Sequence, residues 1–480
     1  MNKDLNTHFC IIGSGPAGSI LAKNLAKKGF KVIIVEAGNL DTKNIKQPLL
    51  DKINIDKDYQ VKLNSSYQMG GASNLWSGKM HYLDEIDFIK RSHIHNFTWP
   101  FNKIKLAYYY KKAAKIFSSP DNNKLKNFFL PSIKTKKNTN ISIKQIYTSN
   151  KPYSFKNFLK TKDNSLKNIK VLTDSKVISL SQEGKNKKIS NINVKDKRLN
   201  NFKINAKFFI LACGGIEIPR IMLNSKNKNF PNGIGNQNGN VGKYFSTHPK
   251  GNLGVAKINK KINFNLTKNK NVSKGFFRGG IVLQSKTLIK NKLVNHFVEF
   301  YPYSENNFMF KGFQRLKKIK SLIGFKEDHN YFHARYQLDQ IPNKKNKIFL
   351  SKKKDKYGVP LVNINWKFTK ADQKSLTKFN THINSFFKNE NIGNLYLNFK
   401  KNKKEFIALH SHFMGTTRMG KNPKNSVTNH YGKVHGLKNL FISGPSLFPT
   451  YGNSNPMLTI AALALRQCDY LLNTGKRNLL

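Results

Sequence analysis

Four short runs of apolar residues without polar interruption lie far apart along the chain, at 9–12, 32–35, 208–212 and 440–442. Strands of a parallel sheet covered on both faces have this pattern, because neither side of such a strand meets water. We therefore predict that the four runs pair within one sheet, although they are scattered through the sequence.

The first run leads directly into a glycine turn, Gly13-Ser14-Gly15-Pro16-Ala17-Gly18, which is followed by a helical apolar pattern. In such a turn Gly13 makes the tight bend, Gly15 lets a pyrophosphate approach bare backbone, and Gly18 lets the helix pack closely on the strand. The free N–H groups of the helix N-terminus then face the phosphates. The spacing predicts a dinucleotide site that begins at the end of the first strand.

Glu36 ends the second run, eighteen residues after Gly18. A carboxylate at this point accepts hydrogen bonds from a ribose hydroxyl and repels a 2′-phosphate. The nucleotide is therefore expected to be FAD or NAD, not NADP.

Short alternating patterns fill residues 171–206, at Val171–Leu172, Val177–Leu180 and Ile189–Val194. They predict a β-meander that returns to the nucleotide sheet at the run 208–212. The stretch 99–117 carries apolar residues at helical intervals, and predicts an amphipathic helix whose three consecutive tyrosines at 108–110 serve packing.

Residues 251–404 contain aromatic-rich strand patterns at 275–283, 296–303 and 331–337, separated by lysine-rich turns. These patterns predict an antiparallel sheet in a second lobe. The segments 120–165 and 313–330 are polar enough to be mobile loops.

With 480 residues and 38% apolar content, the chain has room for two domains or for one two-lobed unit. No apolar run approaches the length of about 18 residues of a membrane span, and the first strand begins too early for a secretory peptide. We therefore expect a cytoplasmic protein. Cys10, Cys213 and Cys468 are widely spaced, which favours reduced thiols over a disulfide or metal framework.

Lysine and arginine outnumber the acidic residues by 85 to 25, which gives a formal charge of +60. Such an excess usually indicates a nucleic acid, an anionic membrane or an acidic polymer as partner. The lysines are dispersed and often stand beside asparagines, as at 185–188 and 343–347, whereas a binding surface is typically a localised patch with interleaved aromatics. A general compositional bias explains them better, so a nucleic-acid partner is not expected, and a peripheral membrane contact has no support in the sequence. The excess should still attract anionic substrates.

Two histidines, His410 and His412, precede the sequence Phe413-Met414-Gly415-Thr416-Thr417-Arg418, and a turn 449–456 that ends in Asn455-Pro456 follows. Histidine is the side chain best suited to accept a proton near neutral pH, so either of the two could act as a general base. A buried structural histidine, or half of a metal site made by His410 and His412, are the alternatives. No carboxylate or second histidine pair follows at a supporting spacing, so we expect no metal.

These blocks resemble the glucose–methanol–choline (GMC) family of flavoprotein oxidoreductases. The resemblance extends to the turn 13–18, to the segments 36–38, 70–78, 214–220 and 240–242, and to Trp99-Pro100 and His248-Pro249. It implies an FAD-dependent enzyme and covers most of the chain apart from about 120–165 and 251–404.

The resemblance implies that His412 is the general base for hydride transfer to flavin N5, and that Asn455 holds the substrate oxygen. An amide can do this without competing for the proton. His410 is the second candidate for the base, although two residues away it need not face the same pocket.

The resemblance also implies a set of FAD-binding residues around the glycine turns and the start of the last helix. They are Gly13, Gly15, Pro16, Ala17, Gly18, Glu36, Ala37, Gly70, Gly71, Ser73, Asn74, Leu75, Val177, Cys213, Gly214, Gly444, Pro445, Asn455, Pro456 and Met457. Some relatives attach FAD covalently through a histidine where this chain has Leu75, so non-covalent FAD is implied. The chain departs from the family at Ser443-Gly444, where an acidic residue is usual, and at Ile218-Pro219.

The predicted fold class is α/β, or α+β overall, with a Rossmann-like FAD-binding domain that carries a β-meander and an antiparallel-sheet substrate-binding domain. The FAD-binding domain is expected to be discontinuous, over 1–100, 167–250 and 405–480, and the substrate-binding or cap domain to take 101–166 and 251–404. The substrate is expected to be a sugar, a polyol or a related alcohol, with features nearer the sugar-oxidising branch. The sequence does not identify the electron acceptor.

Two other functions stay open at this level. One is a basic flavoprotein in which FAD is structural and the lysines bind a polyanion or a membrane surface. The other is a flavin monooxygenase or amine oxidase that shares only the first glycine turn, but neither accounts for the blocks around His412 and Asn455.

Overall fold

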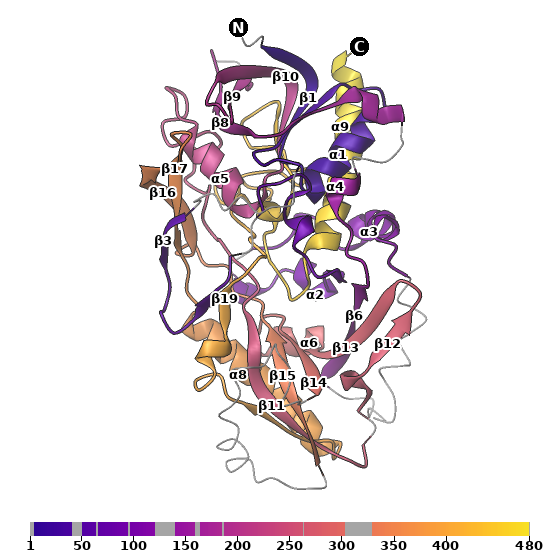
Figure 1. Cartoon of the computed structure of the whole chain (residues 1–480). Coiled ribbons are helices and arrows are strands. Elements are labelled where there is room, and N and C mark those ends of the chain that lie inside the picture. Colours follow the sequence, from indigo (N-terminus) through magenta and orange to yellow (C-terminus); the bar gives the residue numbers. More distant parts are fainter. Residues whose placement is uncertain are drawn as a thin grey trace.

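The structure is a computed structural model that describes residues 4–40, 50–63, 66–94, 97–120, 140–158, 164–184, 187–262, 264–302 and 329–479 of the chain. Two large sheets make up its two ends, and both termini lie at the end that carries the first strand (Figure 1). The short helix α2 (Glu85–Phe88) lies between the sheets, and β19 (Ile407–Leu409) belongs to the second of them.

The first sheet has the strand order β7-β2-β1-β10-β9-β8, with β20 paired to β10. Its strands are β1 (Leu5–Ile12), β2 (Val32–Val35), β7 (Ile169–Leu172), β8 (Ser175–Ser181), β9 (Asn191–Asp196), β10 (Asn201–Leu211) and β20 (Leu440–Ile442). β1 lies between β2 and β10, and β20 pairs with the other side of β10, all in parallel. The prediction that the four apolar runs share one sheet is confirmed.

β8 is antiparallel to β9, and β9 is antiparallel to β10, as the predicted β-meander requires. The expectation for Val171–Leu172 was wrong, because these residues belong to β7, which pairs in parallel with β2 at the edge of the nucleotide sheet. Two apolar residues alone do not indicate which strand they pair with. By pairing with β2, β7 extends the parallel part of the sheet.

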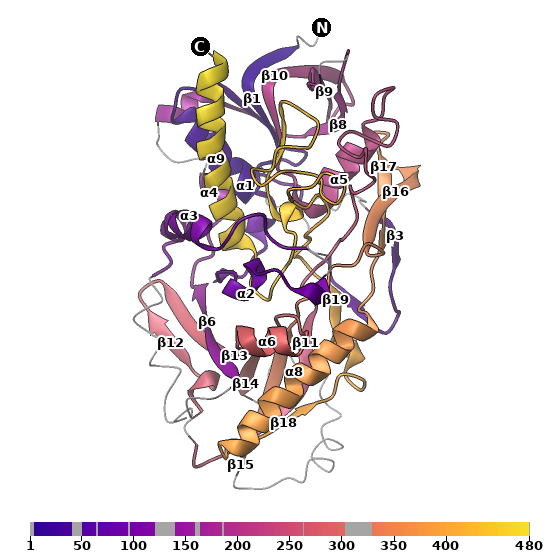
Figure 2. The ribbon, with the colours of Figure 1, turned by 180° about the vertical axis from the view of Figure 1, so that it is seen from behind.

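Three helices gather beside this sheet: α1 (Pro16–Ala26), α3 (Ile104–Ile116) and α9 (Met457–Leu479). α9 contacts both α1 and α3, so segments from the beginning and the end of the chain lie side by side (Figure 2). α3 confirms a helix over 104–116 but not over 99–103. It is amphipathic, but the predicted apolar face was wrong in part: Leu106 and Tyr110 are buried, while Ile104 and Tyr108 are 76% and 58% exposed. A fourth helix, α5 (Gly214–Asn224), contacts β8 of the same sheet.

The second sheet has ten strands in the order β4-β19-β11-β15-β14-β13-β6-β5, with β12 on β13 and β18 on β11. Its remaining strands are β4 (Gln60–Val61), β5 (Lys79–Met80), β6 (Ile141–Ser149), β11 (Lys250–Asn259), β12 (Asn269–Val272), β13 (Gly275–Leu283), β14 (Phe297–Pro302), β15 (His329–Gln337) and β18 (Gly393–Leu397). The pairs β11–β15, β15–β14, β14–β13 and β13–β6 are antiparallel, which confirms the predicted antiparallel lobe. Of the predicted strand 296–303, residue 303 lies outside the described residues.

The second lobe is not made of strands alone. α8 (Lys370–Asn389) crosses one face of the ten-stranded sheet, and α6 (Ser285–Lys290) lies beside it (Figure 2). A separate three-stranded sheet contains β16 (Lys347–Lys354), β17 (Pro360–Asn365) and β3 (Leu50–Asn54), with β3 parallel to β17. Only antiparallel strands were expected in this lobe, so the helices α6 and α8 and the parallel pair β3–β17 correct that expectation.

Part of the segment 120–165 was expected to be a loop and is not. Residues 141–149 form β6, and α4 (Phe155–Phe158) follows. Residues 121–139, 159–163 and most of 313–330 lie outside the described residues, so the expected mobility of these loops stays untested. One hydrophobic core joins residues of both large sheets, and the proposed domain boundaries stay a prediction.

None of the described helices is long and apolar enough to cross a membrane. Cys10 and Cys468 are buried and Cys213 is half-buried, and all three are free thiols.

Candidate active site

A cavity of about 590 Å³ lies where the nucleotide sheet meets the ten-stranded sheet. Its walls come from the turn after β1, the loop 66–79, the strand ends of β8 and β10, and the segment that carries His412. The side chains of β11, β14 and β15 close the opposite end. Residues from distant parts of the sequence therefore share one hollow.

The glycine turn has the geometry that its sequence predicts. Gly13 has φ +102°, and a Cβ built on it would lie 2.9 Å from the carbonyl oxygen of Ala212. A Cβ on Gly18 would lie 2.0 Å from the carbonyl oxygen of Gly13, so the helix packs directly on the turn. A Cβ on Gly15 would meet nothing within 4 Å, which leaves bare backbone open to a ligand.

Three helices begin at the cavity. Pro16 at the start of α1, Gly214 at the start of α5 and Met457 at the start of α9 all line it. Helix N-termini present unpaired N–H groups and the positive end of the helix dipole. The cavity therefore suits an anionic ligand that spans all three, such as the pyrophosphate of a dinucleotide.

Glu36 lies at the carboxyl end of β2 and lines the same cavity. It accepts hydrogen bonds from the backbone N–H and the hydroxyl of Ser14, at 3.0 and 2.6 Å, and from the N–H of Gly38 at 3.0 Å. Burial raises the pKa of this carboxyl, and these hydrogen bonds oppose the shift. The carboxylate is thus held in place at the edge of the glycine turn.

The second glycine loop meets the first. A Cβ on Gly71 would lie 3.2 Å from Cα of Gly15, and the N–H of Gly70 donates to the Ser14 hydroxyl at 3.0 Å. Ser73 donates to the carbonyl of Gly70 at 2.6 Å, and Asn74 donates to the carbonyl of Gly71 at 3.1 Å. These two polar side chains hold the loop and do not line the cavity.

Most of the residues proposed for FAD line this cavity. They are Gly13, Gly15, Pro16, Ala17, Glu36, Ala37, Gly71, Leu75, Val177, Cys213, Gly214, Gly444, Pro445, Asn455, Pro456 and Met457. Gly18, Gly70, Ser73 and Asn74 do not line it. They support the conformation of the two glycine turns from positions outside the cavity lining.

His412 lines the cavity and its ring contacts a second histidine, His248. The two Nδ1 atoms are 2.9 Å apart, and Nε2 of His248 lies 3.2 Å from the carbonyl oxygen of Tyr451. Burial lowers the pKa of His248 to about 4, and burial together with His248 lowers the pKa of His412 well below 6.5. Both rings are therefore neutral at pH 7.

The protons of the two rings follow from these partners. A carbonyl oxygen only accepts, so Nε2 of His248 carries the proton and its Nδ1 is an acceptor. The proton between the two Nδ1 atoms then belongs to His412, which leaves Nε2 of His412 unprotonated. Nε2 makes no hydrogen bond within the part of the chain that the structure describes.

His410 also lines the cavity, against the expectation that it need not face the same pocket. Burial lowers its pKa to about 4, and its Nδ1 contacts the hydroxyl of Ser411. The described residues contain no group of three histidines, cysteines or acids that could hold a metal ion.

Asn455 lies next to the start of α9 and lines the cavity together with His412. Its Oδ1 accepts a hydrogen bond from Nε2 of Gln337 at 3.1 Å, so the amide nitrogen is oriented away from that contact. Gln337, which comes from β15, was not among the predicted site residues.

A buried polar network holds the turn before Asn455. Nζ of Lys144 donates to Oδ2 of Asp84 at 2.7 Å, to the hydroxyl of Ser454 at 2.9 Å, and to the side chain of Asn453. Asn453 in turn donates to Asn295 at 2.9 Å. The sequence did not indicate these residues, because they belong to no motif and only the packing of β6 against the turn brings them together.

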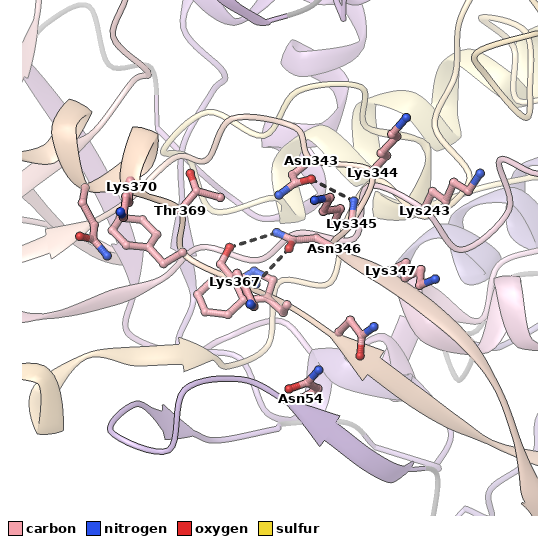
Figure 3. A pocket seen from close by; sticks show the side chains of 14 residues that line it. Asn54, Lys243, Asn343, Lys344, Lys345, Asn346, Lys347, Lys367, Thr369 and Lys370 are labelled. Carbon is pink, nitrogen blue, oxygen red and sulfur yellow. Dashed lines mark hydrogen bonds between the residues drawn. The ribbon is translucent and has the colours of Figure 1, made fainter.

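A second hollow, of about 920 Å³, lies near β16 and the start of α8 (Figure 3). It is lined by asparagines, aromatic rings and six lysines, and its lining includes no histidine and no acidic residue. Asn346 bonds to the backbone of Lys367 at 3.2 and 3.0 Å, which ties the two walls together. Without a base or a glycine turn, this hollow offers nothing for alcohol oxidation.

Two family models match the chain. The model described as "FAD binding domain" matches residues 6–216, and the model described as "GMC oxidoreductase" matches residues 342–464. The first contains both glycine turns, and the second contains His412 and Asn455.

Two curated proteins are similar to this chain in sequence. A 2-methyl-1,2-propanediol dehydrogenase from Mycolicibacterium austroafricanum is 28% identical over 56% of this chain and 48% of its own length. The fructose dehydrogenase large subunit from Gluconobacter japonicus is 25% identical over 64% of this chain and 55% of its own. The chain thus spans about half the length of these curated relatives.

Among solved structures, an FAD-dependent oxidoreductase from Chaetomium thermophilum has the same fold, with a TM-score of 0.62 and 12% identity over 98% of this chain and 100% of that one.

Proposed function

The chain belongs to the GMC oxidoreductases, and from that membership we propose that it is an FAD-dependent enzyme that oxidises a CH–OH group of a sugar, a polyol or a related alcohol. The observation that carries the proposal is the unprotonated Nε2 of His412 in the same cavity as the glycine turns. A proton acceptor and a dinucleotide cradle in one hollow are what this reaction needs.

The cavity fits FAD on its own geometry. The backbone of Gly15, Gly214 and Gly444 borders open space where a Cβ would meet nothing within 4 Å, and a side chain there would fill the cradle. Glu36 would accept from a ribose hydroxyl, and the starts of α1 and α5 would face the phosphates. When bound, FAD supplies the acceptor for the hydride of the C–H bond.

In the proposed reaction, Nε2 of His412 removes the hydroxyl proton of the substrate. The amide of Asn455, oriented by Gln337, donates a hydrogen bond to the substrate oxygen and so fixes it relative to His412. His412 acts as the base in its neutral form, because burial lowers its pKa.

The pH dependence of substrate oxidation should follow from the lowered pKa of His412. A histidine that stays neutral to lower pH stays competent as a base, so the rate of flavin reduction at saturating substrate should be flat from pH 8 down to 6.5. We expect it to fall through a single ionisation below pH 6.5, as measured by anaerobic stopped-flow absorbance. A midpoint at or above pH 7 would contradict the role of His412.

His248 is proposed as a positioning residue that keeps the proton of His412 on Nδ1. His248→Phe preserves the ring but removes the acceptor, and should slow flavin reduction by roughly 10- to 100-fold, the range for orienting partners. Nitrogen-15 NMR should then report a mixture of His412 tautomers. His248→Asn, whose side-chain oxygen can accept from Nδ1, should recover most of the rate, and equal rates in both variants would refute the role.

The bound FAD is proposed to be non-covalent, since Leu75 cannot form a bond to flavin and lies at the cavity wall. Precipitation of the protein with trichloroacetic acid should release all flavin absorbance into the supernatant. Flavin retained in the pellet would show a covalent bond to some other side chain.

The proposed function is tested by the anaerobic visible spectrum of the purified protein before and after addition of sugars, polyols and simple alcohols. Bleaching of the flavin by one class of alcohol supports the proposal. Bound flavin that no alcohol bleaches would favour a structural FAD, and a protein that binds no FAD would refute the proposal outright.

A further inference from the structure

The end of the cavity farthest from the glycine turns is formed by one face of the ten-stranded sheet. Lys250 of β11 stands opposite Gln337 of β15, and Arg335, two residues before Gln337, stands opposite Glu299 of β14. Residues two apart on a strand point to the same side, and directly paired residues share a face. All four line the cavity, together with Lys79 from β5.

This face carries more positive than negative charge. Nζ of Lys79 lies 3.0 Å from a carboxylate oxygen of Glu299, and the hydroxyl of Tyr301 donates to the same carboxylate at 3.1 Å. Although burial opposes its ionisation, Lys79 and Arg335 hold the pKa of Glu299 below its usual range. The single carboxylate is thus ionised and already paired with Lys79.

Lys250 and Arg335 have no carboxylate within ion-pair distance among the described residues. Burial, followed by the charges of Arg335, Lys79 and the exposed Lys62, lowers the pKa of Lys250 to about 7. Like charges held close together in a partly buried site repel each other, and an anion placed between them would relieve the repulsion. Within the part of the chain that the structure describes, Glu299 is the nearby carboxylate and is paired with Lys79, so the other two cations are arranged for a further negative partner.

Resting on the proposed function, we propose that the substrate is a hydroxyl compound that also carries a carboxylate or a phosphate, and that Lys250 and Arg335 bind this anionic group. The guanidinium of Arg335 can contact two oxyanion oxygens at once, and Lys250 adds a point charge. Gln337, which contacts Asn455, lies directly opposite Lys250, so the anion site and the hydroxyl site are neighbours.

The general lysine excess does not explain this arrangement. The lysines around the hollow of Figure 3 include the exposed Lys344, and the lining of that hollow contains no carboxylate and no histidine. In the cavity, by contrast, Lys250 and Arg335 are half-buried beside the buried Glu299 and share their hollow with His412. The net charge of +60 would add a long-range attraction for an anionic substrate.

The test compares compounds with one carbon skeleton and different charge: glycerol, glycerate and glycerol 3-phosphate, and glucose, gluconate and glucose 6-phosphate. Flavin reduction is followed anaerobically with the holoenzyme. We expect an anionic compound to give the highest kcat/KM in at least one set, and the acid and the phosphate in that set distinguish the two sources of charge. If neutral compounds reduce the flavin as well as or better than the anions in both sets, the inference is wrong while the proposed function stands. If none reduces it, the proposed function fails as well.

Three variants and one control connect the preference to these residues. Lys250→Gln and Arg335→Gln should each raise KM for the preferred anion by roughly 10- to 100-fold, the value of a lost charge-assisted hydrogen bond, and leave KM for its neutral counterpart unchanged. Glu299→Gln should lower KM for the anion, because it removes the competing carboxylate. Lys344→Gln, which removes one charge from the other hollow, should change neither.

A second measurement avoids turnover. Isothermal titration of the anaerobic holoenzyme, with its flavin already reduced so that the anion cannot be oxidised, should show binding of the preferred anion that weakens by the same factor in Lys250→Gln and Arg335→Gln. Unchanged absorbance of the oxidised flavin beforehand shows that the variants are folded. Equal losses for anionic and neutral compounds, or binding that is indifferent to both substitutions, would overturn the inference.

Discussion

Replacement of His412 by alanine should leave FAD bound and slow its reduction by substrate by roughly 10²- to 10⁴-fold, the usual range for a lost general base. The cavity wall at His412 is separate from the glycine turns, so the cradle for FAD should survive. Anaerobic stopped-flow measurement of flavin bleaching gives the rate directly, and the visible spectrum gives the flavin content.

His410→Ala is the matched control for this experiment. Both histidines line the cavity, but only His412 has a ring partner that fixes its proton. We expect His410→Ala to change the reduction rate by no more than a few-fold. If instead His410→Ala abolished reduction and His412→Ala did not, the base would be His410.

Replacement of Gly18 by valine should abolish FAD binding. The new Cβ would lie 2.0 Å from the carbonyl oxygen of Gly13 and 3.2 Å from Cγ2 of Ile11, so α1 must move away from the turn. Gly13 cannot move aside, because its backbone, at a φ of +102° that only glycine adopts readily, already lies against Ala212. The N–H groups at the start of α1 would then lose their position, and the protein should purify without flavin absorbance.

Gly29→Ala provides the control for backbone strain. Gly29 has φ +84°, but a Cβ there meets nothing within 4 Å. Alanine at this position should cost about 1 kcal/mol of stability and retain the flavin. Retention of full flavin in Gly18→Val would show that the close contact is not needed for binding.

The nucleotide sheet could be predicted because its signals are local. Each buried strand is a continuous apolar run, and the glycine turn follows one of them directly. The prediction for β7 was wrong because two apolar residues do not specify which strand they pair with. α8 was missed although Leu376, Phe379 and Ile383 recur at helical spacing and Thr369 and Asp372 form a capping box. The phenylalanines of this segment, Phe379, Phe386 and Phe387, also suit a strand, and only the sheet surface that α8 covers favours the helix.

The site was predictable in part for the same reason. The glycines and His412 stand in motifs, whereas Lys250, Glu299 and Arg335 meet only through the register of three antiparallel strands. A register is set by pairing across dozens of residues and leaves no short pattern in the sequence. His248 was visible in a motif, but its contact with His412 joins residues that are 164 positions apart.

The strand order of the nucleotide sheet also dictates when this protein can mature. β1 has both of its partners, β2 and β10, by residue 211, but β10 also needs β20 near the end of the chain, so the nucleotide sheet is completed only by late long-range pairing. During synthesis the edge of β10 at Phe209–Leu211 stays unpaired until Leu440–Ile442 have left the ribosome. Expression of this protein should accordingly depend on chaperones that shield such edges, and cofactor capture should follow release of the chain and not accompany its synthesis.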